Sequence, residues 1–266
     1  MSNFIHPTAI IEPGAEFGLG VKIGPFCTVG KNVMLEDGVE LVSHVAIDGR
    51  TRVGAGAQIF PFATIGLEPQ DLKYKGEDTE TVIGPRTKIR EHASIHRGTV
   101  TGTGITRIGA DCLLMATVHV AHDCIVGDGV IISNNVALGG HVEVGERAII
   151  GGNAALLQFV RVGAGAMVGG LTGVTRDVIP YARVFGTRAE LLGLNLIGLK
   201  RRGLEKAQLH EVNNAYKFLF CGAGVFADRV AELMARNEDP YIREILDFIA
   251  TPSKHGILTN VAGEEE

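Results

Sequence analysis

The sequence predicts a parallel β-helix built from hexapeptide repeats, followed by a helical domain. Three observations support this prediction: an aliphatic side chain recurs at every sixth position, the composition is unusual, and the repeat stops at Pro180. The 266 residues include 36 glycines and no tryptophan, and only 6% are aromatic. A narrow prism filled by layers of valine, isoleucine and alanine needs no large aromatic residues, so composition and periodicity agree.

The repeat starts close to the first residue of the chain. A period of six fits neither the 3.6-residue period of a helix nor the alternation of a simple strand. We expect each hexapeptide to form one side of a prism from a short strand and a tight turn, so that three hexapeptides close one coil and residues 18 positions apart stack. The N-terminal hexapeptide positions are Ile5, Ile11, Phe17, Ile23, Val29, Leu35, Leu41, Ile47, Val53, Ile59 and Ile65.

Two irregularities interrupt the repeat. The pattern lapses after Ile65 and resumes at Ile83, and the intervening GLEPQDLKYKGEDTETV is too polar to fill a prism. We therefore expect a protruding loop at about residues 69–80, and loops on rigid scaffolds commonly carry function. From Ile95 to Ile108 the spacing is 13 residues, one more than two hexapeptides, which predicts a second and smaller irregularity within VTGTGITR.

The second half of the repeat has no interruption. Cys27, Cys112 and Cys124 fall four residues after an aliphatic position, where a small side chain would fill a corner, so we expect neither disulfides nor a zinc–cysteine site. The regular positions are Ile108, Leu114, Val120, Val126, Ile132, Leu138, Val144, Ile150, Leu156, Val162, Val168 and Val174.

The sequence changes character beyond Pro180. Leu209, Val212, Tyr216 and Leu219 recur at helical spacing. We expect further helices at 223–236 and 239–250. The predicted division is a β-helix domain at 1–186 and a C-terminal helical domain at 187–266.

Charge and hydropathy exclude several classes of protein. The net charge of −5 gives no reason to expect a nucleic-acid partner. No apolar run is long enough to predict an integral membrane segment, and the N-terminus lacks the basic region of a secretory signal. We expect a cytoplasmic protein.

Histidines within the repeat are the candidates for chemistry. His122 and Gly140 are 18 residues apart, so they should lie on adjacent coils, with an imidazole beside a backbone N–H and with Asp123 next in the chain. Such a pair would offer a general base and an oxyanion donor. Two other interpretations are open: plain surface histidines, or a zinc site of His119, His122 and His141, although HxxH ligands on a coil do not obviously converge.

Several longer strings resemble one enzyme family. They are PQDLKYKGE, IHRGT, HVAHDC, NNVALGGHVEVG, MVGG, NLIGLKRRG and NAYKFLF, and they occur in the family's order over almost the whole chain. In these the chain resembles the UDP-N-acetylglucosamine O-acyltransferases that begin lipid A biosynthesis. The resemblance implies a left-handed parallel β-helix that forms a homotrimer, with active sites between neighbouring prisms.

The resemblance also implies an activity and a set of site residues. Family members transfer an (R)-3-hydroxyacyl chain from acyl carrier protein to the 3-position of the sugar of UDP-N-acetylglucosamine, with no metal or other cofactor. By resemblance, His122 is the general base, Asp123 its orienting carboxylate and Gly140 the oxyanion donor. The substrate-binding positions would be Asp71, Lys73, His96, His119, His141, Gln158, Asn195 and Arg201, and Gly170 would set the acyl-chain length.

Two positions depart from the family pattern. Leu157 stands where the best-known members have histidine, and Ile197 stands where they have glutamate. The nucleotide or sugar contacts therefore differ, and an alternative acceptor is the 3-amine of a UDP-3-amino-sugar analogue. The N-acyltransferase of the same pathway is less compatible, because it is expected to have a separate N-terminal domain, whereas the repeat here begins at Ile5.

Overall fold

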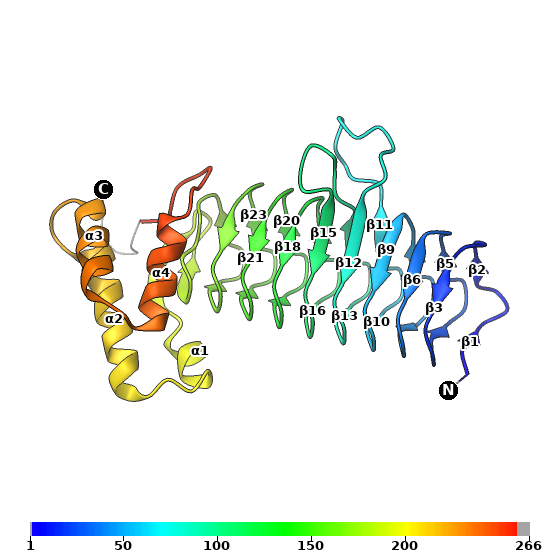
Figure 1. The fold of residues 1–266 in the computed structure, drawn as a ribbon, viewed down its shortest axis with the longest axis horizontal. Helices are drawn as coiled ribbons and strands as arrows, with labels where there is room; N and C mark the ends of the chain where they lie inside the picture. Colours follow the sequence, from blue (N-terminus) through cyan, green and yellow to red (C-terminus); the bar gives the residue numbers. More distant parts are fainter. Residues whose placement is uncertain (1, 260–266) are drawn as a thin grey trace.

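The chain forms a long three-sided prism that ends in helices, as Figure 1 shows in a computed structural model that describes residues 2–259. Three sheets, parallel except for the last strand of sheet A, form the sides of the prism. Sheet A contains β1 (Phe4–Ile5), β4 (Lys22–Ile23), β7 (Glu40–Leu41), β10 (Gln58–Ile59), β13 (Lys88–Ile89), β16 (Leu113–Leu114), β19 (Ile131–Ile132), β22 (Ile149–Ile150), β25 (Met167–Val168), β27 (Ala182–Phe185) and β28 (Glu190–Leu194).

Sheets B and C complete the prism. Sheet B contains β2 (Ile10–Ile11), β5 (Thr28–Val29), β8 (Ala46–Ile47), β11 (Thr64–Leu67), β14 (Ser94–His96), β17 (His119–Val120), β20 (Ala137–Leu138), β23 (Ala155–Leu156) and β26 (Gly173–Val174). Sheet C contains β3 (Glu16–Phe17), β6 (Val33–Leu35), β9 (Arg50–Val53), β12 (Glu80–Ile83), β15 (Ile105–Ile108), β18 (Ile125–Val126), β21 (Glu143–Val144) and β24 (Arg161–Val162). The chain passes from A to B to C, so the prism has an A–B, a B–C and a C–A edge.

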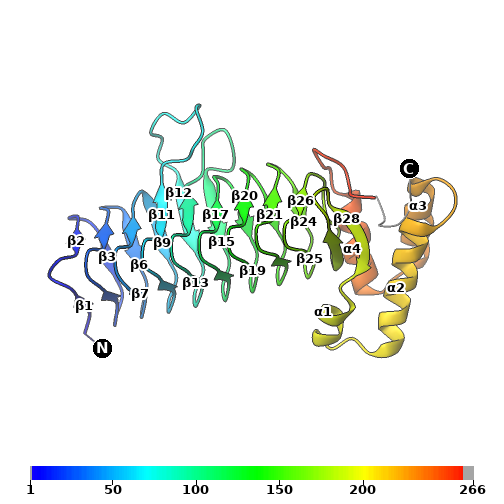
Figure 2. The same cartoon turned by 180° about the vertical axis from the view of Figure 1, so that it is seen from behind.

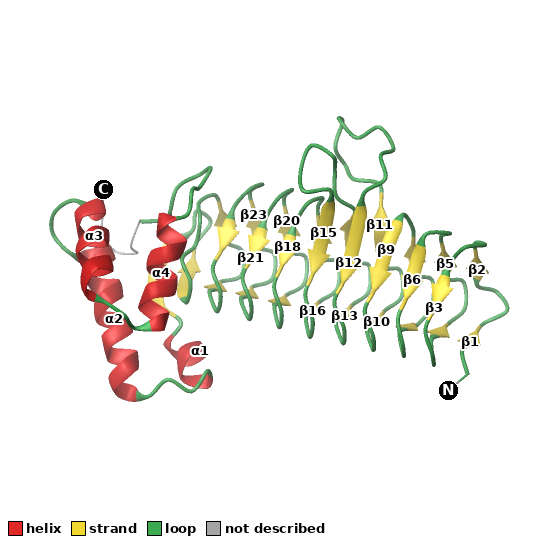
Figure 3. Ribbon diagram, viewed as in Figure 1, coloured by secondary structure: helices red, strands yellow, loops and turns green. Residues whose placement is uncertain are grey.

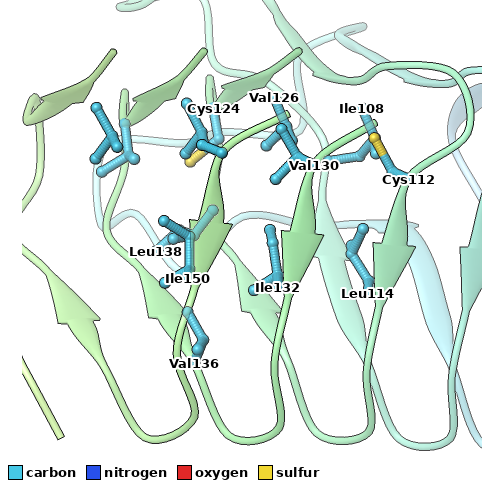
Figure 4. Packing of buried hydrophobic residues seen from close by; sticks show 14 of the residues in the cluster. Ile108, Cys112, Leu114, Cys124, Val126, Val130, Ile132, Val136, Leu138 and Ile150 are labelled. Atoms are coloured by element: carbon cyan, nitrogen blue, oxygen red, sulfur yellow. The ribbon is translucent and has the colours of Figure 1, made fainter. Parts of the chain in front are cut away.

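Strand register follows the period of the sequence. Val120 of β17 pairs with Leu138 of β20, and Leu138 pairs in turn with Leu156 of β23. The hexapeptide positions from Ile23 onward are buried inside the prism, and the corner cysteines Cys112 and Cys124 fill the space beside them (Figure 4). Ile5 is 42% exposed, because the first coil has no coil below it.

Both irregularities of the repeat leave the prism at the B–C edge. The first excursion runs through residues 68–79, between β11 and β12, and the second through residues 97–104, between β14 and β15. Figure 1 shows the two loops side by side above the strands, and the Arg97 guanidinium lies 5.7 Å from the centroid of the Tyr74 ring. The two loops therefore form one projecting wall along this edge.

The end of the prism is closed by a hairpin and four helices within the described residues (Figure 3). Strand β28 pairs antiparallel with β27, and the predicted division at residue 186 falls in the turn between them. The predicted helical domain begins instead with a strand, β28, which covers the open edge of sheet A. The helices are α1 (Leu196–Arg201), α2 (Lys206–Cys221), α3 (Phe226–Arg236) and α4 (Pro240–Ala250). No helix within residues 2–259 is long and apolar enough to cross a membrane.

Buried polar contacts attach the helices to the prism. The Arg161 guanidinium pairs with Asp177 (Nε to Oδ2, 2.7 Å) and stacks 4.5 Å from the Phe248 ring centroid of α4. After α4 the chain turns back, and the Leu258 N–H donates to the Asp177 carbonyl at 2.8 Å. We call residues 251–258 the return segment. Figure 2 shows this segment on the same side of the molecule as the two loops.

Candidate active site

The His122–Asp123 pair lies on the B–C edge, directly after β17. His122 Nδ1 is 2.8 Å from Asp123 Oδ2, and the His122 side chain is 15% exposed. Asp123 has a left-handed backbone with φ of 59°, a conformation that aspartate tolerates better than most residues. The turn thus points the imidazole outward and the carboxylate beneath the second loop.

Asp123 remains ionised although its side chain is fully buried. Burial would raise the pKa of this carboxyl, but hydrogen bonds from Thr99 and His122 lower it below its ordinary value. A negative carboxylate at this place holds His122 in the tautomer whose Nε2 has a free lone pair. The pair can therefore accept a proton from a molecule in the pocket.

Gly140 lies directly beside the His122 ring. A β-carbon built on Gly140 would be 2.7 Å from His122 Cε1 and 2.8 Å from Nε2, so only glycine allows the ring this position. The Gly140 N–H has no hydrogen-bond partner among residues 2–259. The equivalent N–H groups at the C–A edge, those of Leu19 and Ala110, donate to aspartate side chains at 2.7 and 2.8 Å. The free N–H beside a base is the arrangement that an oxyanion requires.

His141 belongs to a stack on the next coils. Its ring is parallel to that of Phe159 at a centroid distance of 4.3 Å. Lys254 of the return segment places its Nζ 3.2 Å from the centroid of the Phe159 ring. Burial lowers the pKa of His141; the Asp123 carboxylate opposes this effect, and His122 and Lys254 add to it, so that the pKa stays below its ordinary value. His141 is therefore neutral at pH 7.

His122, His141, Phe159 and Lys254 line a pocket of about 920 Å³ between the first loop and the return segment. Asp71 and Lys73 lie on the loop side, where the Lys73 N–H donates to Asp71 Oδ1 at 3.0 Å. Phe159 and Lys254 were not among the predicted site residues. The 18-residue period from His141 could have indicated Phe159, whereas the sequence holds no signal for Lys254. The lining residues are Gln70, Asp71, Leu72, Lys73, Thr101, Gly102, Thr103, His122, His141, Gln158, Phe159 and Lys254.

His119 lies on β17, which leads into His122, and His96 lies on the adjacent strand β14 of sheet B; both are outside this pocket lining. His119 Nδ1 is 2.7 Å from Ser94 Oγ, and its ring contacts the His96 ring edge-on at a centroid distance of 4.9 Å. Burial is the main cause that lowers the pKa of His96 to about 4, with the neighbouring His119 and His122 adding to it. His96 is thus a neutral, buried imidazole.

This depressed pKa predicts that the fold loses stability in mild acid. Between pH 6.5 and about 4 the unfolded chain binds a proton at His96 that the folded chain does not, so the stability falls as the pH falls. When the pH has fallen below about 4, protonation at His96 has lowered the free energy of unfolding by about 3 kcal/mol in total. We expect the thermal midpoint of His96→Gln to depend less on pH between 7.5 and 5 than that of the wild type. Parallel pH dependence in the two proteins would contradict the buried neutral state.

The other predicted residues lie at different edges of the same chain. Gly170 is at the A–B edge, where a β-carbon would meet the Gly152 carbonyl oxygen at 3.1 Å. Asn195 caps α1 and donates through Nδ2 to the Gly165 carbonyl at the C–A edge at 3.0 Å, and Arg201 ends that helix. Leu157 and Ile197 are exposed by 44% and 68%. One chain does not bring Gly170, Asn195 or Arg201 to the His122 pocket, whereas Leu157 lies on the B–C edge directly before the lining residue Gln158.

The zinc hypothesis is not favoured by the arrangement of the ligands. The cluster with potential ligand atoms within 4.8 Å is His122, Asp123 and His141, whereas His119 faces Ser94. Both oxygens of Asp123 already accept hydrogen bonds from the second loop. These contacts suit a carboxylate that orients a histidine.

A prism of hexapeptide coils with a His–Asp pair on one edge defines the class of hexapeptide-repeat transferases, and residues 105–140 match the model of the bacterial transferase hexapeptide. Residues 177–258 match domain 2 of UDP-N-acetylglucosamine O-acyltransferase. A curated relative from Azorhizobium caulinodans, an acyl-acyl-carrier-protein UDP-N-acetylglucosamine O-acyltransferase, is 49% identical over 95% of this chain and 94% of its own. The chain belongs to the UDP-N-acetylglucosamine O-acyltransferase family.

Solved structures agree with this assignment. UDP-N-acetylglucosamine O-acyltransferase from Moraxella catarrhalis is 42% identical, with a TM-score of 0.93 over 96% of this chain and 99% of that one. The UDP-N-acetylglucosamine acyltransferase from Campylobacter jejuni is 36% identical, with a TM-score of 0.91 over 96% and 99%. The predicted fold class, a left-handed parallel β-helix followed by helices, is confirmed.

Proposed function

We propose that this protein transfers an (R)-3-hydroxyacyl chain from acyl carrier protein to the 3-hydroxyl of the sugar of UDP-N-acetylglucosamine, as the first step of lipid A biosynthesis. The observation behind the proposal is the His122–Asp123 pair beside the free N–H of Gly140, in a chain of this family. The relatives' names specify an O-acyltransferase, which favours oxygen over the amine alternative. Because both substrates are expected in the cytoplasm, the proposal places the protein there.

The geometry supports a general-base mechanism. His122 Nε2 takes the proton of the acceptor hydroxyl while its oxygen attacks the thioester carbonyl carbon. The Gly140 N–H stabilises the tetrahedral oxyanion, and the intermediate then collapses with loss of the carrier thiolate. His122 returns its proton to that thiolate, and Asp123 stabilises the imidazolium that exists between the two transfers. This sequence of steps requires no metal or cofactor.

The remaining predicted residues are proposed to bind substrates. Asp71 and Lys73 can contact the sugar and the diphosphate from the first loop, while His141 and Gln158 face the same pocket. A lysine and an arginine suit a diphosphate, because they offer charge-assisted hydrogen bonds. His96 and His119, on neighbouring strands of sheet B beside this pocket, are proposed to contribute to the substrate site. Asn195 and Arg201 are proposed to hold the nucleotide.

Direct assay tests the activity. Purified protein is incubated with UDP-N-acetylglucosamine and a panel of 3-hydroxyacyl carrier proteins, and the products are read by mass spectrometry. The expected product is the 3-O-acyl sugar nucleotide. An equal amount of the 3-amino analogue as competing acceptor tests the alternative that Leu157 and Ile197 motivated, and a strong preference for the amine would overturn the oxygen assignment.

The separation of the predicted residues over three edges supports a homotrimer with composite sites. In a threefold assembly the B–C edge of one prism can face sheet A of its neighbour, whose two edges carry Gly170 and the contact of Asn195, and this would bring these residues and Arg201 near the His122 pocket of another chain. Asp71 and His122, by contrast, line one pocket of one chain.

Subunit mixing is expected to show this division of the site. Coexpression of His122→Ala with Arg201→Ala chains should restore about a quarter of the wild-type sites, because random mixing pairs an intact edge with an intact neighbour in that fraction. His122→Ala with Asp71→Ala is the matched control and should restore none. Equal recovery in the two mixtures, or a fully active monomer by light scattering, would refute composite sites.

Gly170 is proposed to leave the acyl groove open for a long chain, around fourteen carbons by resemblance. Each additional buried CH₂ contributes about 0.8 kcal/mol until the chain meets a wall. The variant Gly170→Met is expected to shift the preference to a donor several carbons shorter, since overpacking costs more than the lost burial. Rates with ten-, twelve- and fourteen-carbon donors check this. An unchanged order of preference would place the floor of the groove elsewhere.

A further inference from the structure

The second loop is folded around the carboxylate of Asp123. The N–H groups of Thr103 and Gly104 donate to Oδ1 at 3.0 and 3.1 Å, and the Thr99 N–H lies 3.1 Å from Oδ1 and 3.2 Å from Oδ2. A β-carbon on Gly102 would overlap the carboxylate, so the loop needs glycine there to approach it. The loop that interrupts the repeat between Ile95 and Ile108 thus provides the donors for one buried anion.

The two oxygens of this carboxylate have different surroundings. Oδ2 accepts from the Thr99 hydroxyl at 2.7 Å, and it is also the oxygen that lies 2.8 Å from His122 Nδ1. Oδ1 lies 3.2 Å from the Thr103 hydroxyl, which also lies 3.0 Å from the Ile105 carbonyl oxygen, and His122 contacts Oδ2 rather than Oδ1. The Thr99 hydroxyl and the imidazole therefore share one oxygen, and Thr99 is itself only 2% exposed.

We propose that Thr99 is a positioning residue for acyl transfer, whose hydroxyl fixes the orientation and the basicity of the Asp123 oxygen that holds His122. This inference rests on the proposed function, because it assigns Thr99 a role through Asp123 and His122 rather than in contact with substrate. A buried carboxylate stays ionised only when donors replace the water that it has lost. Without the hydroxyl, Oδ2 becomes more basic and binds a proton more readily.

Other titratable groups surround this pair. Cys124 lies beneath it, and burial raises the pKa of that thiol to about 12, so it stays neutral. Other titratable groups near the pair or its neighbour His141 include His96, His119, Asp71, Lys73 and Lys254. They are unchanged in the variants below, so a difference between variants reports the Thr99 contact.

The test compares Thr99→Val with Thr99→Ser across a pH series. For Thr99→Val we expect kcat/KM at pH 7 to fall by about tenfold. We also expect the acidic limb of the plot of kcat/KM against pH to move up by about half a pH unit, because the lost hydrogen bond is to a charged acceptor. Serine keeps the hydroxyl and should restore the position of the limb. Thr103→Val is the matched control, since it removes a hydroxyl from the same loop and carboxylate but from the other oxygen, and it should move the limb less than half as far.

Two results would overturn the proposal. A Thr99→Val profile that keeps its acidic limb while kcat falls uniformly would mean that the threonine only supports the loop. An equal shift in Thr103→Val would remove the special role of Oδ2. Hydrogen exchange of residues 97–104, slow in the wild type and fast in Asp123→Asn, checks the anchoring without any substrate. If wild-type protein transfers no acyl chain but shows this protection, the proposed function fails while the anchoring stands.

Discussion

Substitution of His122 by alanine is expected to lower kcat by roughly 10²–10⁴-fold, the usual contribution of a general base. The imidazole projects outward from the prism and contacts Asp123 and the His141 ring rather than the aliphatic core. The fold and the assembly should therefore survive the change. Steady-state kinetics with saturating acceptor and donor measures the loss.

A matched histidine variant separates catalysis from folding. His92 is an exposed turn histidine at the A–B edge, and its ring stacks on Phe62. His92→Ala should keep turnover close to the wild-type value, and circular dichroism should be alike for both variants. Turnover of His122→Ala within a few-fold of the wild type would refute the assignment of the base.

The variant Gly140→Ala is expected to lower kcat/KM by roughly 10²-fold or more, comparable to the loss of one oxyanion donor. Gly140 does not have a left-handed backbone, so alanine is conformationally allowed there. The new methyl group would instead lie 2.7 Å from His122 Cε1. Either the imidazole or the coil that supplies the N–H must move, and both belong to the proposed mechanism.

A double variant tests this cause. If the methyl group acts through the imidazole, Gly140→Ala should lower the thermal midpoint of the wild type but have little effect on stability in a His122→Ala background. Equal destabilisation in the two backgrounds would show that the backbone itself rejects a side chain at this position. Full activity of Gly140→Ala would exclude the close pairing of this N–H with the base.

The period of the sequence was sufficient to predict the coils and the core of the site. Once residues 18 apart are known to stack, His122 and Gly140 must be neighbours, and the interruptions at 65–83 and 95–108 must leave the prism. The period determines this because each coil of a solenoid contacts only its nearest neighbours. The order of residues along the chain therefore gives their order along the prism. The left-handed sense and the substrates came from the resemblance to a family.

Contacts between elements with no common period were decided only by the tertiary structure. Strand β28 pairs with β27 because an open sheet edge was available, and Lys254 reaches Phe159 because α4 docks through Arg161 and Asp177. The enclosure of Asp123 depends on the path of a loop whose residues lie about twenty positions earlier. Such contacts arise from packing of surfaces that are distant in sequence, and no local propensity or spacing encodes them.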